Sequence, residues 1–446
     1  MEPQKCVHAL VRSQGRPAEG YRMSRKKQPI LSRRRALAGL AATCAVGIAG
    51  STSASAEEIT GPIFSPSGPN AELYGSAEGY PVPDAATARR QGNPWEPRDR
   101  VGAFTHIDAI YPTRLVKRAA APWSYRRAPA ALSDPFRDRV TGYLSRNPVT
   151  GLLLIRDDQI LFEHYQYGRT DRDRFVSQSM VKSITGLLIG IAIADGTIKS
   201  VDDLPGAYVP GLKGSEYGAT AIRDLLHMSS GVEFGEEQER GRDLNRLWRD
   251  MVSGSGKGTI ASITQFSRRI ASAGTRFYYA SIEPDVLGVV LRYATGKSLS
   301  DYLQEKIWGP IGTEDDAKWL LDAEGFELAH FGFNAVLRDY ARLGRLLAHD
   351  GAWEGRQIIP ASWMIEATTV RPSDGYLAPG RTSPDSLGYG YLIWLLPGTR
   401  RQFALLGSYG QLVLVDPPSK LVMVQTALDR GEDIWKLWAA AVKQFG

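Results

Sequence analysis

Residues 179–194, SMVKSITGLLIGIAIA, place a serine, a lysine three residues later and a long apolar run next to one another. The run predicts a buried helix from Val181 to Ala194. Because positions i and i+3 lie on one face of a helix, the Lys182 amine can reach the Ser179 hydroxyl. A serine becomes a strong nucleophile when a base takes its proton, and a lysine can be that base in its neutral form, which apolar surroundings favour. The stretch therefore indicates a core helix that carries a nucleophile and its base.

The same spacing also fits a purely structural role. Ser179 can occupy the first turn of the helix while Lys182 points into solvent. The S-x-x-K pattern occurs a second time, from Ser24 to Lys27. The pattern therefore needs support from elsewhere in the chain.

Support comes from residues 274–281, GTRFYYAS, which are followed by Leu287 and Gly288. With S-x-x-K upstream, this order resembles the serine β-lactamase and penicillin-binding protein superfamily, in particular its class C-like branch of 6-aminohexanoate-dimer hydrolases and esterases. That branch has G-T-x-F-x-Y-[SA]-[NS] followed by L-G. The resemblance implies that Ser179 is the nucleophile, Lys182 its lysine and Tyr279 the catalytic tyrosine. Ser281 stands where asparagine is usual. Aromatic core packing is the alternative role for Tyr279, but its register to Leu287 and Gly288 favours the catalytic one.

Further segments extend the resemblance over roughly residues 120–446. They are residues 225–232 (LLHMSSGV), 334–342 (NAVLRDYAR), 351–353 (GAW) and 404–411 (ALLGSYGQ). The resemblance implies a β-lactamase/transpeptidase-like α/β fold, an antiparallel sheet flanked by helices with an inserted all-α region. The last segment lies where β-lactamases carry K-T-G, and it has no lysine. Its G-x-x-G-Q form is like the 6-aminohexanoate branch, which makes recognition of a β-lactam carboxylate unexpected.

The implied chemistry is acyl transfer with an acyl-enzyme on Ser179. Lys182 accepts the serine proton and Tyr279 relays a proton to the leaving amine or alcohol, although which of the two is the general base stays open. The oxyanion would be held by two backbone amides, those of Ser179 and Leu406. Substrate-binding candidates are Ser281, Gly407, Tyr409, Gln411 and Glu236. Glu236 belongs to a charged loop, residues 235–242, which fits a substrate rim or simple solvation.

Apolar patterning predicts strands near both ends of the chain and helices between them. Expected strands are 151–156, 160–165, 389–395, 403–406, 411–415 and 421–424; expected helices are 181–194, 221–228, 285–294, 299–308, 335–349 and 434–445. Such an order predicts a sheet closed by both ends of the chain, with a helical insertion and a cleft between the two parts.

The formal net charge of +6 is concentrated at one end. Residues 1–56 hold ten basic and two acidic side chains, so that 44 basic and 46 acidic side chains remain for residues 57–446. A nucleic-acid-binding function, which +6 suggests, therefore lacks a basic surface to support it. Arg338, Arg342 and Arg345 share one helical face, but Asp339 offsets them.

The first 56 residues have the order of an export signal. A basic segment (24–35) precedes an apolar run (36–50) and an A-x-A site at 54–56. Residues 32–37, SRRRAL, resemble a twin-arginine signal, which implies export of a folded protein. A basic tail or a lipoprotein anchored at Cys44 are the alternatives, and Met23 is a candidate start. We expect an exported, periplasmic or secreted protein.

The sequence predicts that the chain is divided into three segments. They are a signal peptide (1–56), a Pro/Gly-rich lead-in that is ordered only in part (57–120) and a hydrolase domain (121–446). Both cysteines, Cys6 and Cys44, fall in the first segment, which excludes a disulfide scaffold.

Motifs for other kinds of functional site are incomplete or absent in this sequence. Residues 254–258 suggest a phosphate-binding loop, but Gly258 stands where serine or threonine would bind magnesium. There is no G-x-S-x-G elbow. The histidines are not at metal-ligand spacing, and His227 fits a core or cap residue. We therefore expect no cofactor and no metal, a small amide or ester as substrate, no nucleic-acid partner and no membrane span. The alternative function is a penicillin-recognising protein, namely a β-lactamase, a DD-peptidase or a sensor that acylates without turnover; natural substrate and oligomeric state stay open.

Overall fold

The computed structural model describes residues 61–86, 95–128, 134–236, 242–252 and 256–446. The expected signal peptide, with Met23, Cys6 and Cys44, lies outside these ranges. Within them, no helix is long and apolar enough to cross a membrane.

A nine-stranded sheet forms the centre of the fold, in the order β1-β5-β4-β15-β14-β13-β12-β11, with β3 also paired to β5. Its strands are β1 (Ile63–Phe64), β3 (Arg126–Arg127), β4 (Val149–Arg156), β5 (Gln159–Tyr165), β11 (Gly388–Tyr389), β12 (Trp394–Leu395), β13 (Phe403–Gly407), β14 (Gln411–Asp416) and β15 (Leu421–Ala427). The early hairpin β4–β5 meets the late strands where β4 pairs antiparallel with β15. The sheet is thus closed by both ends of the chain, as the sequence predicts; only β1 and β3 run parallel to their neighbour β5.

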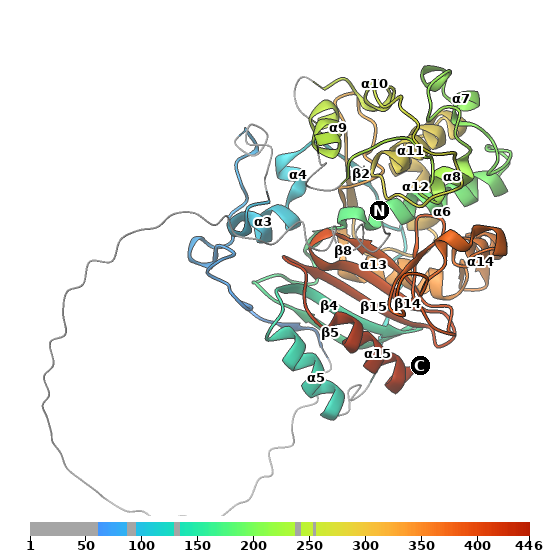
Figure 1. The fold of residues 1–446 in the computed structure, drawn as a ribbon. Coiled ribbons are helices and arrows are strands. Elements are labelled where there is room, and N and C mark those ends of the chain that lie inside the picture. The colour runs from blue at the N-terminus through green and yellow to red at the C-terminus, as the bar shows by residue number, and fades with distance from the viewer. Residues whose placement is uncertain (1–60, 87–94, 129–133, 237–241, 253–255) are drawn as a thin grey trace, which may run out of the picture.

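Helices cover both faces of this sheet (Figure 1). On one face α13 (Leu337–Ala348) packs against β14, β15 and β4. Gly344 allows this close approach, because a Cβ there would lie 2.5 Å from Val422 Cγ1. On the other face α5 (Asp134–Leu144) and α15 (Ile434–Phe445) pack together, and α15 also contacts β15.

The middle of the chain forms the helical part seen above the sheet in Figure 1. Its centre is the pair α6 (Val181–Ala194) and α11 (Ile282–Thr295), both buried along most of their length. The other helices of the described residues are α3 (Arg100–Thr105), α4 (Ile107–Ile110), α7 (Pro205–Tyr208), α8 (Ile222–Leu226), α9 (Arg242–Val252), α10 (Thr259–Ile263), α12 (Leu299–Leu303) and α14 (Ala361–Ala367).

This part is not purely helical, which refines the expected all-α insertion. A second sheet has the order β2-β7-β8-β6, from β2 (Thr113–Val116), β6 (Arg174–Val176), β7 (Ala317–Leu320) and β8 (Phe333–Val336), and β9 (Ala352–Trp353) pairs with β10 (Arg356–Gln357). The strand β8 is buried at every position, so that it shows no alternation from which a strand can be recognised.

Several predicted elements have different limits in the structure, and two of them show the physical reason. The helix expected over 335–349 begins only at Leu337, because residues 335 and 336 belong to β8. The strand expected over 389–395 is interrupted between β11 and β12, where Leu392 has a φ of 56°. A positive φ at a leucine ends the extended conformation, and the two short strands fold back on each other.

Residues 61–86 and 95–120 of the lead-in belong to the described residues. Ile63 and Phe64 add a parallel strand to the edge of the main sheet, α3 is buried at every residue, and α4 is buried at Ile107 and Ile110.

Candidate active site

Ser179 and Lys182 are in contact at the start of α6. A short 3-10 turn, η3 (Gln178–Met180), leads into the helix, and the Lys182 Nζ donates a hydrogen bond to the Ser179 Oγ at 2.7 Å. Lys182 is 2% exposed, which contradicts the alternative of a solvated lysine. A second hydrogen bond, from Lys182 Nζ to the His330 carbonyl oxygen at 2.9 Å, fixes the amine in place.

The backbone before the nucleophile is in an unusual conformation. Gln178 has a φ of 49°, in the left-handed region that non-glycine residues seldom adopt. Residues held in this region are frequent at active sites, where the surrounding structure maintains the strain.

Tyr279 lies beside the same lysine. Lys182 Nζ is 5.1 Å from the centroid of the Tyr279 ring, and Trp394 stacks on this ring with centroids 5.7 Å apart. Tyr279 is 2% exposed, so that it serves both as a packed aromatic ring and as a neighbour of the lysine. The structure thus brings together the three residues that the motifs single out, although 100 positions separate the serine from the tyrosine.

The end of β13 borders the nucleophile. A Cβ on Gly407 would lie 2.5 Å from the Ser177 carbonyl oxygen and 2.9 Å from Gln178 Cβ. Glycine is therefore needed for the strand to approach η3 this closely. β12 pairs with β13 only at Phe403 and Ala404, which leaves the backbone from Leu405 to Gly407 without a strand on that side. Leu406, the expected second oxyanion donor, lies in this unpaired part.

Ser281 and Glu236 contact each other directly. The Ser281 amide and hydroxyl both donate to the Glu236 carboxylate, at 2.8 and 2.6 Å. Ser281 precedes the first turn of α11, where the helix dipole favours a negative charge. The carboxylate of Glu236 therefore caps the helix that follows the tyrosine motif. Residues 237–241 of the same charged loop lie outside the described residues.

Gly407, Tyr409 and Gln411 line one large cavity together with Tyr279 and Leu406. Gln411 is 2% exposed and its side chain donates to the Ala427 carbonyl oxygen at 2.7 Å, so that it braces β14 against β15. The Tyr409 ring lies under the Arg100 guanidinium, 4.6 Å from its central carbon, and burial raises the pKa of Tyr409.

A pair that the sequence analysis missed supports the lysine. Asp285, on α11, accepts a hydrogen bond from the His330 amide at 3.2 Å and lies 2.7 Å from His330 Nδ1. Both side chains are buried, and the carbonyl oxygen of the same histidine receives the Lys182 amine. No local pattern joins residues 45 positions apart, so the sequence offered no signal for this pair.

The remaining candidates have structural roles. His227 is buried, caps α8 and lies against Tyr391 with ring centroids 4.8 Å apart. Thr259, after the glycines that suggested a phosphate loop, donates its hydroxyl to Asp322 at 2.6 Å. Among the described residues, no group of three or more histidine, cysteine, aspartate or glutamate side chains could hold a metal ion.

The three arginines that share a face of α13 are paired with acidic side chains. Arg338 binds Glu163, Arg342 binds both Glu314 and Asp339, and Arg345 binds Asp157 and Glu354. These pairs neutralise the face that a nucleic acid would need.

Comparisons with known proteins show similarity over most of the chain. The family model described as Beta-lactamase matches residues 136–433. A 6-aminohexanoate-dimer hydrolase from Paenarthrobacter ureafaciens is 26% identical over 363 residues, which cover 77% of this chain and 89% of the relative.

Solved structures share the fold. A protein from Bacillus anthracis described as a putative 6-aminohexanoate-dimer hydrolase has a TM-score of 0.67 at 24% identity, covering 78% of this chain and 94% of its own. An octameric penicillin-binding protein homologue from Pyrococcus abyssi has a TM-score of 0.54 at 18% identity, covering 70% and 77%.

Proposed function

The chain belongs to the beta-lactamase family and is a serine hydrolase, and we propose that it cleaves an amide or ester bond through an acyl-enzyme on Ser179. The observation that carries this proposal is the buried Lys182 amine 2.7 Å from the Ser179 hydroxyl, with Tyr279 beside it. A buried amine in contact with a serine hydroxyl is the arrangement that activates a serine for attack.

The reaction has two halves. Ser179 Oγ attacks the substrate carbonyl carbon while its proton passes to the base, Lys182 or Tyr279. The tetrahedral oxyanion is held by the amides of Ser179 and Leu406. Tyr279 relays a proton to the departing amine or alcohol, and water then hydrolyses the ester on Ser179 by the reverse proton path.

Within this chemistry we favour an enzyme that resembles the 6-aminohexanoate-oligomer hydrolases or the esterases. The relative from Paenarthrobacter ureafaciens supports this choice over most of both chains. The segment at residues 404–411 has no lysine, so that a β-lactam carboxylate lacks its usual cation there. Ser281, Glu236, Gly407, Tyr409 and Gln411 are the proposed substrate-binding positions; among them, the packing of Gln411 favours an indirect role.

The alternative is a penicillin-recognising protein, a β-lactamase, a DD-peptidase or a sensor that stays acylated. The match to the Beta-lactamase family model favours it. Mass spectrometry after incubation with a penicillin separates the two functions. A lasting adduct on Ser179 without ester turnover supports the sensor, and rapid penicillin turnover supports the β-lactamase.

Ester turnover by the purified protein tests the main proposal. We expect the wild type to hydrolyse p-nitrophenyl acetate and to react with a fluorophosphonate probe. Ser179→Ala should abolish labelling and lower kcat/KM by at least about 10³-fold, because the covalent step is lost. Ser145→Ala is a matched control, since Ser145 is exposed and only donates to the Gly142 carbonyl oxygen. Full activity of a folded Ser179→Ala protein would refute the assignment.

We also propose that the protein is exported to the periplasm or secreted. The order of residues 24–56 and the SRRRAL segment support this location. Replacement of the three arginines at 33–35 by lysine should leave the full-length precursor inside the cell, as fractionation and N-terminal sequencing would measure. Unchanged distribution of the triple variant would contradict a twin-arginine route.

A further inference from the structure

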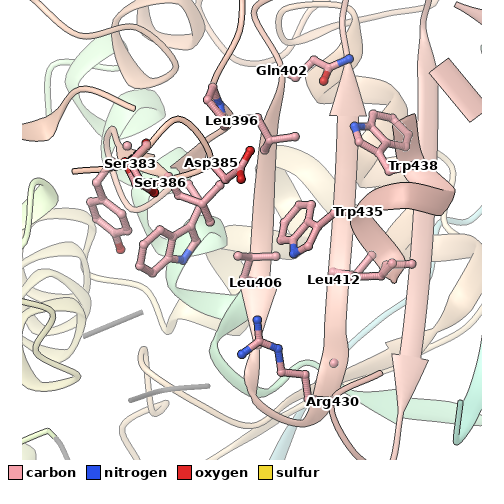
Figure 2. Close-up of a pocket in the computed structure, with 18 of the residues that line it drawn as sticks. Ser383, Asp385, Ser386, Leu396, Gln402, Leu406, Leu412, Arg430, Trp435 and Trp438 are labelled. Carbon is pink, nitrogen blue, oxygen red and sulfur yellow. Dashed lines mark hydrogen bonds between the residues drawn. The ribbon is translucent and has the colours of Figure 1, made fainter. Parts of the chain in front are cut away.

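One cavity is lined by Tyr279 and by many residues beyond the candidate site, whereas Ser179 and Lys182 are not among its lining residues. It has a volume of about 1610 Å³, larger than the roughly 300–1,000 Å³ typical of sites for small ligands. Its lining includes Tyr279, the paired residues Leu406 of β13 and Leu412 of β14, and Trp435 and Trp438 of α15. Figure 2 shows the two tryptophans, which project from α15, in the same space as the leucines of the strands.

The pairing of the strands leaves part of β13 open to this cavity. Because β12 leaves β13 after Ala404, the last residues of β13 have an open edge beside Tyr279. The cavity, which we call the groove, has a lining that includes Leu406 and Gly407 of this edge as well as Ile434, Trp435 and Trp438 of α15. β13 has five residues, which corresponds to a length of about 17 Å.

The walls of this groove are largely apolar. Phe277, Tyr389 and Trp394 form an aromatic cluster next to Tyr279, with centroid distances of 4.8 to 6.3 Å. Farther on, the lining includes Leu396, Pro397, Leu412, Ile434 and Trp438.

The lining also includes polar and charged groups, among them the buried Gln411 and Gln425. Figure 2 shows Ser383, Asp385 and Ser386 on one side of the cavity, and Arg430 below Leu406. Trp435 remains 36% exposed within this lining. An exposed indole in an apolar groove gains stability when an apolar ligand covers it.

We propose that this groove binds a long unbranched aliphatic chain carried by the leaving alcohol or amine of the substrate. The proposal rests on the proposed function, in which Tyr279 gives its proton to the leaving atom. Because Tyr279 lines the cavity, the chain attached to that atom leads along the open edge of β13 toward Trp435. The acyl group of the substrate, which becomes attached to Ser179, is not assigned to this groove.

The proposal predicts a steep dependence of kcat/KM on chain length. Each methylene group that leaves water contributes a factor of up to about four, from roughly 0.8 kcal/mol per group. Acetate esters of ethanol, butanol, hexanol, octanol and decanol vary the leaving chain with a constant acyl group. We expect kcat/KM to rise along this series until the groove is filled, whereas p-nitrophenyl esters of acetic to decanoic acid should not show the same rise.

Trp435→Ala tests the groove itself. The ratio of kcat/KM for decyl acetate to that for ethyl acetate, measured on one preparation, does not depend on the fraction of folded enzyme. We expect this ratio to fall at least about tenfold, because the indole forms one wall of the groove. Tyr293→Ala is the control, since Tyr293 is an aromatic residue of similar exposure (46%) that is not part of the cavity; its ratio should equal that of the wild type.

Failure of this proposal differs from failure of the proposed function. If the wild type cleaves esters through Ser179 but kcat/KM is independent of the leaving chain, or rises only with the acyl chain, the groove assignment is wrong and the hydrolase proposal stands. An unchanged ratio in Trp435→Ala would also overturn the assignment. If no ester is cleaved and Ser179 does not react with the fluorophosphonate, the hydrolase proposal itself fails.

Discussion

Gly407→Ala tests whether the approach of β13 to the nucleophile matters for catalysis. The new Cβ would lie 2.5 Å from the Ser177 carbonyl oxygen, against about 3.4 Å for an ordinary contact. The atom in the way belongs to the backbone, so that strand and turn must separate by about 0.9 Å. Gly407 has extended backbone angles (φ −129°, ψ 159°), which alanine adopts without strain. The substitution therefore widens the separation between β13 and the turn before Ser179 and changes little else.

The effect on the reaction can be derived from this displacement. The proposed oxyanion donor at Leu406 moves with the strand, away from the oxygen that it must stabilise. A misplacement of about 1 Å costs on the order of 10²-fold in rate, and loss of a whole oxyanion donor costs about 10²–10³-fold. We expect kcat/KM for p-nitrophenyl acetate to fall about 100-fold, while the overpacking lowers the free energy of unfolding by about 1–3 kcal/mol.

Gly344→Ala provides the matched control. Its Cβ would also meet an atom at 2.5 Å, a methyl group of Val422, but it lies where α13 packs on the sheet. We expect a similar or smaller loss of stability and unchanged kcat/KM. Urea denaturation would measure stability, and fluorophosphonate titration would count active sites. If folded Gly407→Ala keeps kcat/KM within about threefold of the wild type, the end of β13 does not form part of the catalytic geometry.

Three further predictions concern the base, its support and a buried histidine. Lys182→Ala should lower kcat/KM by at least about 10³-fold, and adding Ser179→Ala should cost little more, because the two residues act as a unit; additive losses would contradict this. The backbone amide and the ring of His330 contact the two carboxylate oxygens of Asp285, and Asp285→Asn leaves only one oxygen. We expect the free energy of unfolding in urea to fall by about 1–3 kcal/mol and kcat to fall as well. No change in either quantity would exclude a role of Asp285 in supporting Lys182. Burial lowers the pKa of His227 to about 4, below its unfolded value near 6.5. The unfolded chain therefore binds the proton more readily than the folded one. Above about pH 6.5 His227 does not reduce the free energy of unfolding, and as pH falls toward 4 its titration lowers that free energy by roughly 3 kcal/mol. His227→Phe should flatten this part of the stability profile, and an equally steep acid loss in the variant would refute the assignment.

The helix α6 and its serine–lysine pair could be predicted from the sequence, because both features are local. An apolar run of 14 residues specifies a buried helix, and two residues three apart on it must be neighbours. The hairpin β4–β5 and the last helix followed from patterns of the same kind. The short strands β6, β7 and β8 did not, since segments of three or four mostly buried residues carry no periodicity.

In the candidate site, too, local sequence identified some features and long-range packing determined others. The motif around Tyr279 identified a residue type and a position, whereas its place 5.1 Å from the lysine amine comes from the packing of separate parts of the chain. The hydrogen bonds of Asp285 to His330, and of Ser281 to Glu236, join residues 45 positions apart. No local rule relates such residues, because their separation is set by how α11 is held against its neighbours.

The sequence by itself determined which groups can react, since a nucleophile, a base and a proton relay are properties of residue types at fixed local spacing. Only the tertiary structure decided what surrounds them. Pairing of β12 with two residues of β13 left an open edge beside Tyr279, and the placement of α15 left a groove with Trp435 on its wall. Strand register and helix docking are long-range packing outcomes, and they fix the shape into which a substrate must fit.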